Sequence, residues 1–201
     1  MNSNNIRLTF GVLIIVLLFV GAGMLLFKSQ SKPRPVDESS HGQFDPLLDK
    51  PLPELDLYDK DGNVYTVESF KGKNVVLFFN EGIMCYPACW DQIAAFGTDE
   101  RFNNDQTAAF SVVTDQPRDW ERAQEKMPDL AKAKLLFDRG AAASRRLGML
   151  DLPSSMHGGV MPGHTYIVLD KEGIVTYIHD DPAMGNNNDL IASKVGVTNN
   201  Y

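Results

Sequence analysis

The pattern of apolar and polar residues begins with one long apolar segment. Residues 8–27 form a run of twenty residues without a charge. At a rise of 1.5 Å per residue, a helix of this length spans about 30 Å, which matches the hydrocarbon core of a bilayer. The pattern therefore predicts one transmembrane helix over residues 8–27.

A cleaved signal peptide is the alternative for this segment. Its apolar stretch usually covers about 7–15 residues and ends at small residues, but here Gly21–Gly23 is followed by the apolar run Met24–Phe27. This favours an uncleaved anchor. Residues 28–48 are polar and contain three prolines, which predicts a flexible tether that leads to a folded domain over residues 49–201.

Strand and helix patterns alternate through that domain. The run Asn74–Phe79 is apolar without interruption, as expected of a strand buried on both faces. Asp61-Gly62 and Asp170–Gly173 are turn sequences between alternating segments, and they predict two hairpins. The fold class is α/β, with a mixed central sheet and helices on both faces. Strands are predicted over residues 54–58, 64–67, 74–79, 108–113, 134–138, 164–169 and 174–178, and helices over 87–96, 117–126, 141–147 and 189–194.

Composition and charge narrow the range of functions. The formal charge of −7, from 19 basic and 26 acidic residues, argues against a nucleic-acid partner, which needs a basic surface. The apolar fraction of 43% is sufficient for a hydrophobic core. Two cysteines cannot act as the framework of a disulfide-rich fold of this length. A close pair of this kind indicates redox chemistry or metal binding.

Cys85 and Cys89 lie between the buried strand and the following helix. Ligands bind at the carboxyl ends of strands in such sheets. If Pro87 begins the helix, Cys85 precedes its amino end and Cys89 lies one turn inside. The free N–H groups and the helix dipole would then stabilise a thiolate at Cys85, and Cys89 would act as the resolving sulfur. The alternative is two inert cysteines in the core.

The sequence resembles the peroxiredoxin-like AhpC/TSA group, the redoxins of the thioredoxin superfamily. The resemblance covers residues 45–180 and follows the order of a hairpin (LDLYDKDGNVYTVESFKGK), the strand NVVLFF, a cysteine motif at a helix start, and HTYIVLDKEGIV. It implies a thioredoxin-like fold without an organic cofactor. It also implies that Cys85 attacks a peroxide and that Cys89 resolves the sulfenic acid as a disulfide. A protein thiol or a small thiol would then reduce the disulfide.

Two positions depart from this family. Gly82 stands where peroxiredoxins carry Thr or Ser three residues before the attacking cysteine, and Gly163 stands where they carry Arg. Glu81 and His164 are candidate accessory residues that could replace the missing groups. Pro162 lies one residue before the position at which thioredoxin-like proteins place a cis-proline. Thiol–disulfide exchange with a protein substrate, which needs only the cysteine pair, remains open beside peroxide reduction.

Two further functions remain open. Sco-type copper chaperones share the anchor, the fold and a Cys-x3-Cys pair, and Cys85, Cys89 and His164 would supply two thiolates and an imidazole to copper. The second further function is that of an anchored, non-enzymatic domain in which the two cysteines form a structural disulfide. Anchored relatives of this kind usually face outward from the cell membrane, so we expect the domain there, although Lys28, Lys32 and Arg34 after the anchor favour the opposite orientation.

Overall fold

The structure, a computed structural model, describes residue 44 and residues 46–196. The expected anchor over residues 8–27 and most of the tether over 28–48 lie outside the described residues. Within the described part, no helix is both long enough and apolar enough to span a bilayer.

A seven-stranded mixed sheet forms the centre of the domain, with the strand order β2-β1-β5-β4-β3-β6-β7. The three central strands β3, β4 and β5 are parallel, and β6 pairs antiparallel with β3. The hairpin β6–β7 forms one edge and the short hairpin β1–β2 the other. The strands are β1 (Leu57–Tyr58), β2 (Val64–Tyr65), β3 (Asn74–Phe79), β4 (Thr107–Val113), β5 (Lys134–Phe137), β6 (Thr165–Leu169) and β7 (Val175–Asp180).

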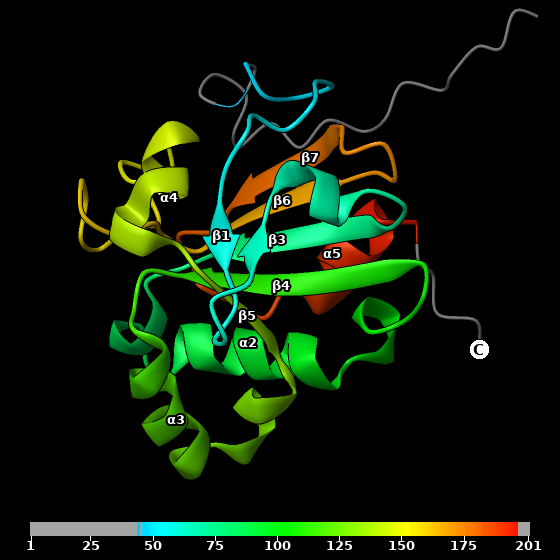
Figure 1. Cartoon of the computed structure of the whole chain (residues 1–201). Helices are drawn as coiled ribbons and strands as arrows, with labels where there is room; N and C mark the ends of the chain where they lie inside the picture. Colours follow the sequence, from blue (N-terminus) through cyan, green and yellow to red (C-terminus); the bar gives the residue numbers. More distant parts are fainter. Residues whose placement is uncertain (1–43, 45, 197–201) are drawn as a thin grey trace, which may run out of the picture. The chain divides into compact units, whose positions relative to one another are not determined.

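Helices cover both faces of the sheet (Figure 1). The helices α2, α3 and α5 contribute to one apolar cluster and α4 to the other. The α-helices are α2 (Ala88–Thr98), α3 (Pro117–Lys126), α4 (Ala142–Arg146) and α5 (Asn188–Lys194). Short 3-10 turns connect them: η2 (Val67–Phe70), η3 (Gly82–Met84), η4 (Glu100–Phe102), η5 (Pro128–Lys132) and η6 (Arg139–Ala141).

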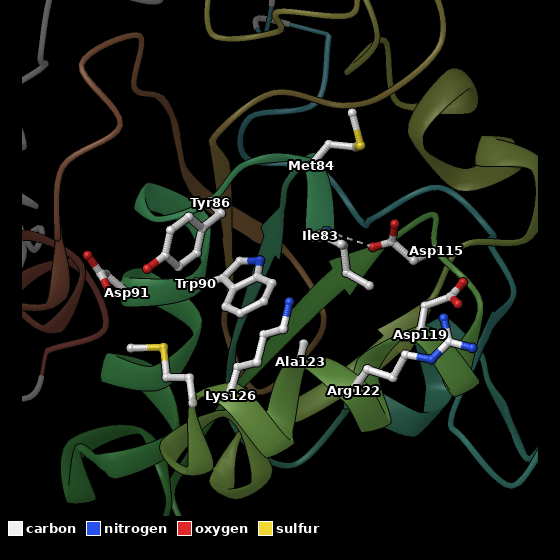
Figure 2. Close-up of a pocket in the computed structure, with 11 residues that line it drawn as sticks. Ile83, Met84, Tyr86, Trp90, Asp91, Asp115, Asp119, Arg122, Ala123 and Lys126 are labelled. Atoms are coloured by element: carbon white, nitrogen blue, oxygen red, sulfur yellow. Dashed lines mark hydrogen bonds between the residues drawn. The ribbon is translucent and has the colours of Figure 1, made fainter.

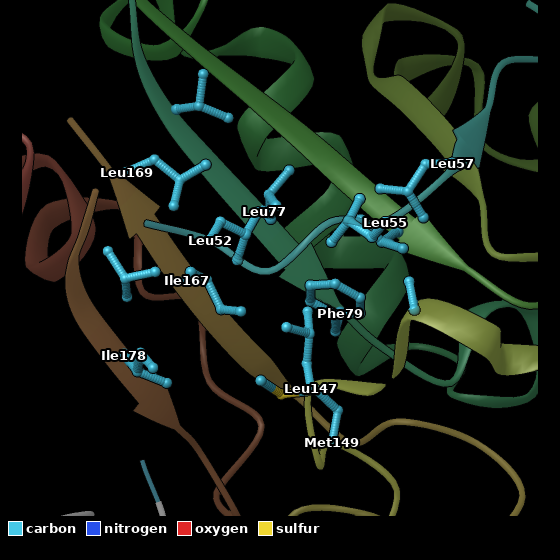
Figure 3. Packing of buried hydrophobic residues seen from close by; sticks show 14 of the residues in the cluster. Leu52, Leu55, Leu57, Leu77, Phe79, Leu147, Met149, Ile167, Leu169 and Ile178 are labelled. Carbon is cyan, nitrogen blue, oxygen red and sulfur yellow. The ribbon is translucent and has the colours of Figure 1, made fainter. Parts of the chain in front are cut away.

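The central strand β3 supports both halves of the core. Its odd-numbered residues, including Leu77 and Phe79, pack in the cluster on the α4 side (Figure 3), whereas Val76 and Phe78 pack under α2. Alternate side chains of a strand point to opposite faces, so a strand between two apolar layers must be apolar at every position. The strand is thereby held between two apolar layers, and its carboxyl end leads into the cysteine motif.

The sheet, its two hairpins and the four helices agree with the prediction, and the ends shift by a few residues. The predicted strand 54–58 was too long: β1 contains only two residues, and a single residue pair, Tyr58 with Phe137, joins it to β5. The helix predicted from Pro87 begins at Ala88, with Pro87 as its N-cap. The five 3-10 turns were not predicted, because they have no apolar periodicity.

Candidate active site

Both cysteines lie just beyond the carboxyl end of β3. The strand ends at Phe79, the turn η3 follows, and Cys85 is the residue that ends this turn. Cys89 is the second residue of α2, in its first turn rather than one turn inside. Cys85 therefore precedes the amino end of an 11-residue helix, where free N–H groups and the helix dipole favour a negative charge.

The structure joins the two sulfurs in a disulfide, with Cα atoms 5.3 Å apart. This separation lies within the range of about 4.4–6.8 Å that a disulfide requires. Cys89 is 0% exposed and Cys85 is 3% exposed, but the side chains of Met84 and Tyr86 on either side of Cys85 are exposed. Cys85 is consequently the sulfur closer to solvent.

His164 contacts the buried sulfur from the neighbouring strand. The residue precedes β6, is 0% exposed, and places its Nδ1 atom 3.7 Å from Sγ of Cys89. Its Nε2 atom lies 3.2 Å from the carbonyl oxygen of Gly185, which can only accept a hydrogen bond. Nε2 therefore carries the proton, and Nδ1 presents its lone pair to Cys89.

Two further side chains fix this tautomer. The hydroxyl oxygen of Tyr166 accepts from Nε2 of His164 at 2.7 Å, and its proton goes to Oε1 of Gln92 at 2.9 Å. The backbone N–H of Asn187 also donates to Oε1 of Gln92, at 2.7 Å, which identifies that atom as the oxygen of the amide. Burial raises the pKa of Tyr166, so its hydroxyl keeps the proton.

Burial also keeps the imidazole neutral. It lowers the pKa of His164 from 6.5 to about 4, although the negative charge of Asp181 acts in the opposite direction. At neutral pH the ring is an uncharged acceptor beside a sulfur atom. It can accept a hydrogen bond from the thiol of reduced Cys89.

Asp115 holds the turn before Cys85. It follows the carboxyl end of β4, and its Oδ2 atom accepts a hydrogen bond from the backbone N–H of Ile83 at 3.1 Å (Figure 2). The same atom accepts a second hydrogen bond from Nε1 of Trp120 at 3.2 Å. Burial raises the pKa of this carboxyl group. Gly82 has a φ of +62°, and a Cβ atom there would lie 1.8 Å from Oδ2 of Asp115. The glycine that replaces the family's Thr or Ser thus leaves the space that the carboxylate occupies.

The accessory candidate Glu81 binds the loop after α4 and not the cysteines. Its buried carboxylate accepts three hydrogen bonds from the loop after α4: from the backbone N–H of Met156 at 2.6 Å, from the backbone N–H of His157 at 2.9 Å, and from Nδ1 of His157 at 3.0 Å. It therefore holds this loop beside the cysteine turn.

The other candidates lie nearby with structural contacts. Pro162 is buried before β6, and the cis peptide bond of the described part precedes Pro87 instead. At Gly163 a Cβ atom would lie 2.0 Å from Oγ of Ser154, so the loop packs where the family carries Arg.

Comparison with known proteins assigns the family. The profile of the Redoxin family matches residues 47–191. The chain belongs to the Redoxin family. Its sequence is 30% identical over 130 residues to the chloroplastic peroxiredoxin Q of Triticum aestivum and 29% to that of Populus jackii. These matches cover 64% of this chain, and they span only 57% and 58% of the two relatives.

Solved structures confirm the thioredoxin-like fold predicted for this redoxin. The peroxiredoxin-like protein of Aquifex aeolicus superposes with a TM-score of 0.60 at 20% identity, over 74% of this chain and 85% of that one. AhpC of Enterococcus faecalis gives 0.61 at 19% identity, over 75% and 90%. BcpB of Mycobacterium tuberculosis gives 0.61 at 18% identity, over 76% and 97%.

The sequence pointed to Cys85, Cys89 and His164, and the structure brings these three together. Sequence reasoning missed Asp115, Gln92 and the hydroxyl of Tyr166. A signal for Asp115 was present, because it follows the strand parallel to β3, and the carboxyl ends of parallel strands meet at one edge. Gln92 lies in the middle of a helix, where nothing in the sequence distinguishes it.

We predict that Gly82→Ala destabilises the protein more than Gly72→Ala. Both glycines have positive φ, but no atom would meet a Cβ at Gly72 within 4 Å. Gly72→Ala should cost about 1–2 kcal/mol for the left-handed backbone, and Gly82→Ala a further ~1–3 kcal/mol for the conflict with Asp115. Urea unfolding of both variants measures the difference. Equal losses would contradict the steric role of Asp115.

We also predict that His164 contributes to the pH dependence of stability in the disulfide form. The pKa of His164 is about 4 in the fold and 6.5 when unfolded, so protons bind the unfolded state preferentially between these values. The free energy of unfolding should fall by about 3 kcal/mol as the pH drops from 7 to 4 because of this group alone. His164→Gln should remove that component. His179→Gln should keep most of it, because the charge of His179 lowers the pKa of His164 less than burial does. Urea unfolding across this range measures both. Identical pH profiles for the two variants would contradict it.

Proposed function

We propose that this protein is a membrane-anchored thiol peroxidase that cycles Cys85 and Cys89 between dithiol and disulfide. The observation that carries the proposal is the disulfide at the amino end of α2, with the unprotonated Nδ1 of His164 3.7 Å from Sγ of Cys89. The similarity to the proteins named peroxiredoxin Q supports a peroxide as the substrate.

In the first step, the Cys85 thiolate attacks the outer oxygen of a hydroperoxide. An S–O bond forms and the O–O bond breaks, so the sulfur is oxidised by two electrons and the peroxide is reduced. The leaving alkoxide or hydroxide takes a proton from solvent. The position of Cys85 before α2 stabilises the thiolate that this step requires.

In the second step, Cys89 resolves the sulfenic acid with His164 as the general base. The thiol of Cys89 gives its proton to Nδ1 of His164, and the thiolate attacks Sγ of Cys85. The S–S bond forms and the S–O bond breaks, and the leaving hydroxide takes the proton from Nδ1 to become water. A thiolate at this distance would raise the pKa of His164, because an opposite charge favours the imidazolium.

A thiol reductant completes the cycle. Two thiol groups, from a protein or from a small thiol, reduce the disulfide and are themselves oxidised to one. The same chemistry in reverse would let the pair exchange with a protein disulfide, which is the alternative substrate. We place the domain on the outer side of the cell membrane, held by residues 8–27 and the tether over 28–48, where an oxidised pair persists until a dedicated reductant reaches it.

The proposal is tested by peroxide oxidation of the reduced full chain. One equivalent of hydrogen peroxide should consume both thiols of the wild type, and Cys89→Ser should stop at a sulfenic acid on Cys85 that dimedone labels. His164→Asn should form the sulfenic acid at the normal rate but close the disulfide at least ~100-fold more slowly, because a general base contributes factors of this size. Stopped-flow fluorescence and mass spectrometry follow the two steps.

The control is His179→Asn, which removes an imidazole of strand β7 whose ring stacks on Tyr166 and Tyr177. It should leave both rates unchanged. Failure of hydrogen peroxide to consume any thiol overturns the peroxidase function. Normal disulfide closure in His164→Asn overturns the role of His164.

Copper binding is the second candidate function, because the sulfurs of Cys85 and Cys89 and a ring nitrogen of His164 lie within 4.8 Å of one another. Two thiolates and an imidazole suit Cu(I). The hydrogen bonds at Nε2 leave Nδ1 free to bind a metal. Only the dithiol form could use this set, since the disulfide occupies both sulfurs.

Competition of the reduced chain with a chromophoric Cu(I) chelator tests this candidate. If copper is the cargo, His164→Ala should weaken binding at least ~10-fold, and His179→Ala should not. Equal affinity of the wild type and His164→Ala would exclude the three-ligand site.

A further inference from the structure

The outer edge of strand β5 is mostly open. On its inner side β5 pairs with β4 along its whole length, from Lys134 to Phe137. On its outer side a single residue pair, Phe137 with Tyr58, joins it to β1. The outer edge at Leu135 therefore has no neighbouring strand in the described part of the chain.

The hydrogen bonds of β5 show which backbone groups face this open edge. The backbone N–H of Asp138 donates to the carbonyl oxygen of Val113 on β4 at 2.8 Å. Successive residues of a strand direct their backbone groups to opposite sides, so the N–H and C=O of Phe137 and of Leu135 face away from β4. Those of Phe137 face Tyr58. Those of Leu135 have no hydrogen-bond partner among the residues that the structure describes.

The hairpin β1–β2 turns away before it reaches Leu135. An antiparallel continuation of β1 would place Lys60 opposite Leu135. Instead, Oδ1 of Asp59 accepts hydrogen bonds from the backbone N–H groups of Asp61 and Asn63, both at 2.9 Å. The side chain of Asp59 thus closes the hairpin turn, and the edge of β5 stays uncovered.

A groove of about 560 Å³ lies over this edge, between the hairpin and α3. Its apolar lining comes from both faces of the sheet. Tyr65 and Phe110 belong to the apolar cluster on the α4 side, whereas Trp120 and Leu135 belong to the cluster under α2. Tyr65, Phe110 and Leu135 are only half-buried. A strand added at this edge would direct its side chains alternately to these two apolar surfaces.

Three carboxylates, Asp59, Asp61 and Glu121, form an acidic rim of the groove around a single ammonium group. They raise the pKa of Lys60, first through its hydrogen bond to Asp61 at 2.8 Å and then through the charges of Asp59 and Glu121. The hydrogen bond from the side chain of Asn63 lowers the pKa of Asp59, so this group stays ionised at neutral pH. Lys60 therefore leaves the acidic rim with an excess of negative charge.

The second cation of the groove is held away from the rim. Nζ of Lys134 donates to Oδ1 of Asn103 at 2.8 Å, and Asn103 pairs with Ala108 at the start of β4. The acidic rim consequently favours a ligand that brings its own positive charge.

We propose that this edge binds an extended, basic peptide segment of another protein, which adds a strand beside β5. The backbone of the segment pairs with the N–H and C=O of Leu135, and its apolar side chains cover Tyr65, Phe110 and Leu135. A Lys or Arg of the segment pairs with the acidic rim. A second copy of this chain is a poor occupant, because its net charge is −7.

This inference goes beyond the proposed peroxidase function and does not depend on it. The lining of the groove includes neither of the cysteines nor His164. The groove is a site for holding a partner, and its occupation requires no redox step.

The first measurement is amide hydrogen exchange of the oxidised full chain in detergent, followed by NMR. Without a partner, the N–H of Leu135 should exchange at least ~100-fold faster than that of Leu136, which faces β4. The probes are two short fluorescein-labelled peptides of alternating Val and Thr with one Lys, placed at the first or the last position because an added strand can run in either direction. The peptide that binds more tightly should slow the exchange of Leu135 and leave Leu136 unchanged.

The second measurement is the affinity of these peptides by fluorescence anisotropy. Leu135→Pro removes the N–H at the open edge and leaves the hydrogen bonds to β4 in place, since proline is tolerated where the N–H of an edge strand faces outward. It should weaken binding at least ~5-fold. Urea unfolding of Leu135→Pro checks that the variant is folded.

A charge reversal tests the acidic rim without a change of the backbone. Glu121→Lys should bind the Lys peptide at least ~5-fold more weakly than the wild type does, and it should bind the same peptide with Glu in place of Lys more tightly. The matched control is Glu125→Lys, the same change on the same helix at a residue that does not line the groove. It should bind both peptides like the wild type.

Four results would overturn the proposal. They are no saturable binding of either Lys peptide, an equal loss in Glu125→Lys, unchanged exchange of Leu135 with the peptide bound, and protection of Leu135 that grows with the concentration of the chain alone. The last result would place a second copy on the edge. None of them bears on the reaction of the cysteines with peroxide, which is measured separately.

Discussion

The contact between the Cys89 sulfur and the Nδ1 atom of His164 depends on a chain of hydrogen bonds that crosses the core. The carbonyl of Gly185 and the hydroxyl of Tyr166 require a proton on Nε2, and Gln92 accepts the proton of Tyr166. The side chains of His164, Tyr166 and Gln92 are buried, so they cannot readily exchange these partners for water, whereas Gly185 lies in an exposed segment. The protonation state of one ring nitrogen is thus set by residues on α2, on β6 and in the segment before α5. The orientation of the neutral His164 ring toward the sulfur of Cys89 therefore depends on several elements at this edge of the sheet.

The turn before Cys85 depends on the close approach of the Asp115 carboxyl group to Gly82. A residue without a side chain at Gly82 lets the carboxylate of Asp115 approach the backbone and accept the N–H of Ile83. At both departures from the family pattern, another group therefore occupies the space that a side chain would need. Gly82 admits Asp115, and Gly163 admits the segment at Ser154. The turn is held by the carboxyl group of Asp115, which follows the parallel strand β4.

Much of this architecture could be read from the sequence because the strongest patterns belong to buried elements. The strand over residues 74–79 and the helix over 117–126 have their predicted ends, since an unbroken apolar run and a proline at the first helical position are local signals. The cysteine pair was equally visible. Three features could not be predicted from the sequence, because each joins residues that are distant in the chain. They are the pairing of β1 with β5, the loop held by Glu81 and the partners of His164. Gln92 and Tyr166 are 74 residues apart, and a single sequence contains no sign of such a contact.

The different surroundings of the two sulfurs bear on which cysteine an incoming thiol would attack in the proposed cycle. Cys89, in the first turn of α2, is 0% exposed and lies beside the imidazole of His164, whereas the neighbours of Cys85 on both sides are exposed. In the proposed cycle an incoming thiolate would attack Cys85, and Cys89 would be the leaving group. The proposal then implies that a transient mixed disulfide would join the electron donor to Cys85. In this proposal the peroxide and the thiol reductant would both react at Sγ of Cys85, so they could not occupy the site at the same time.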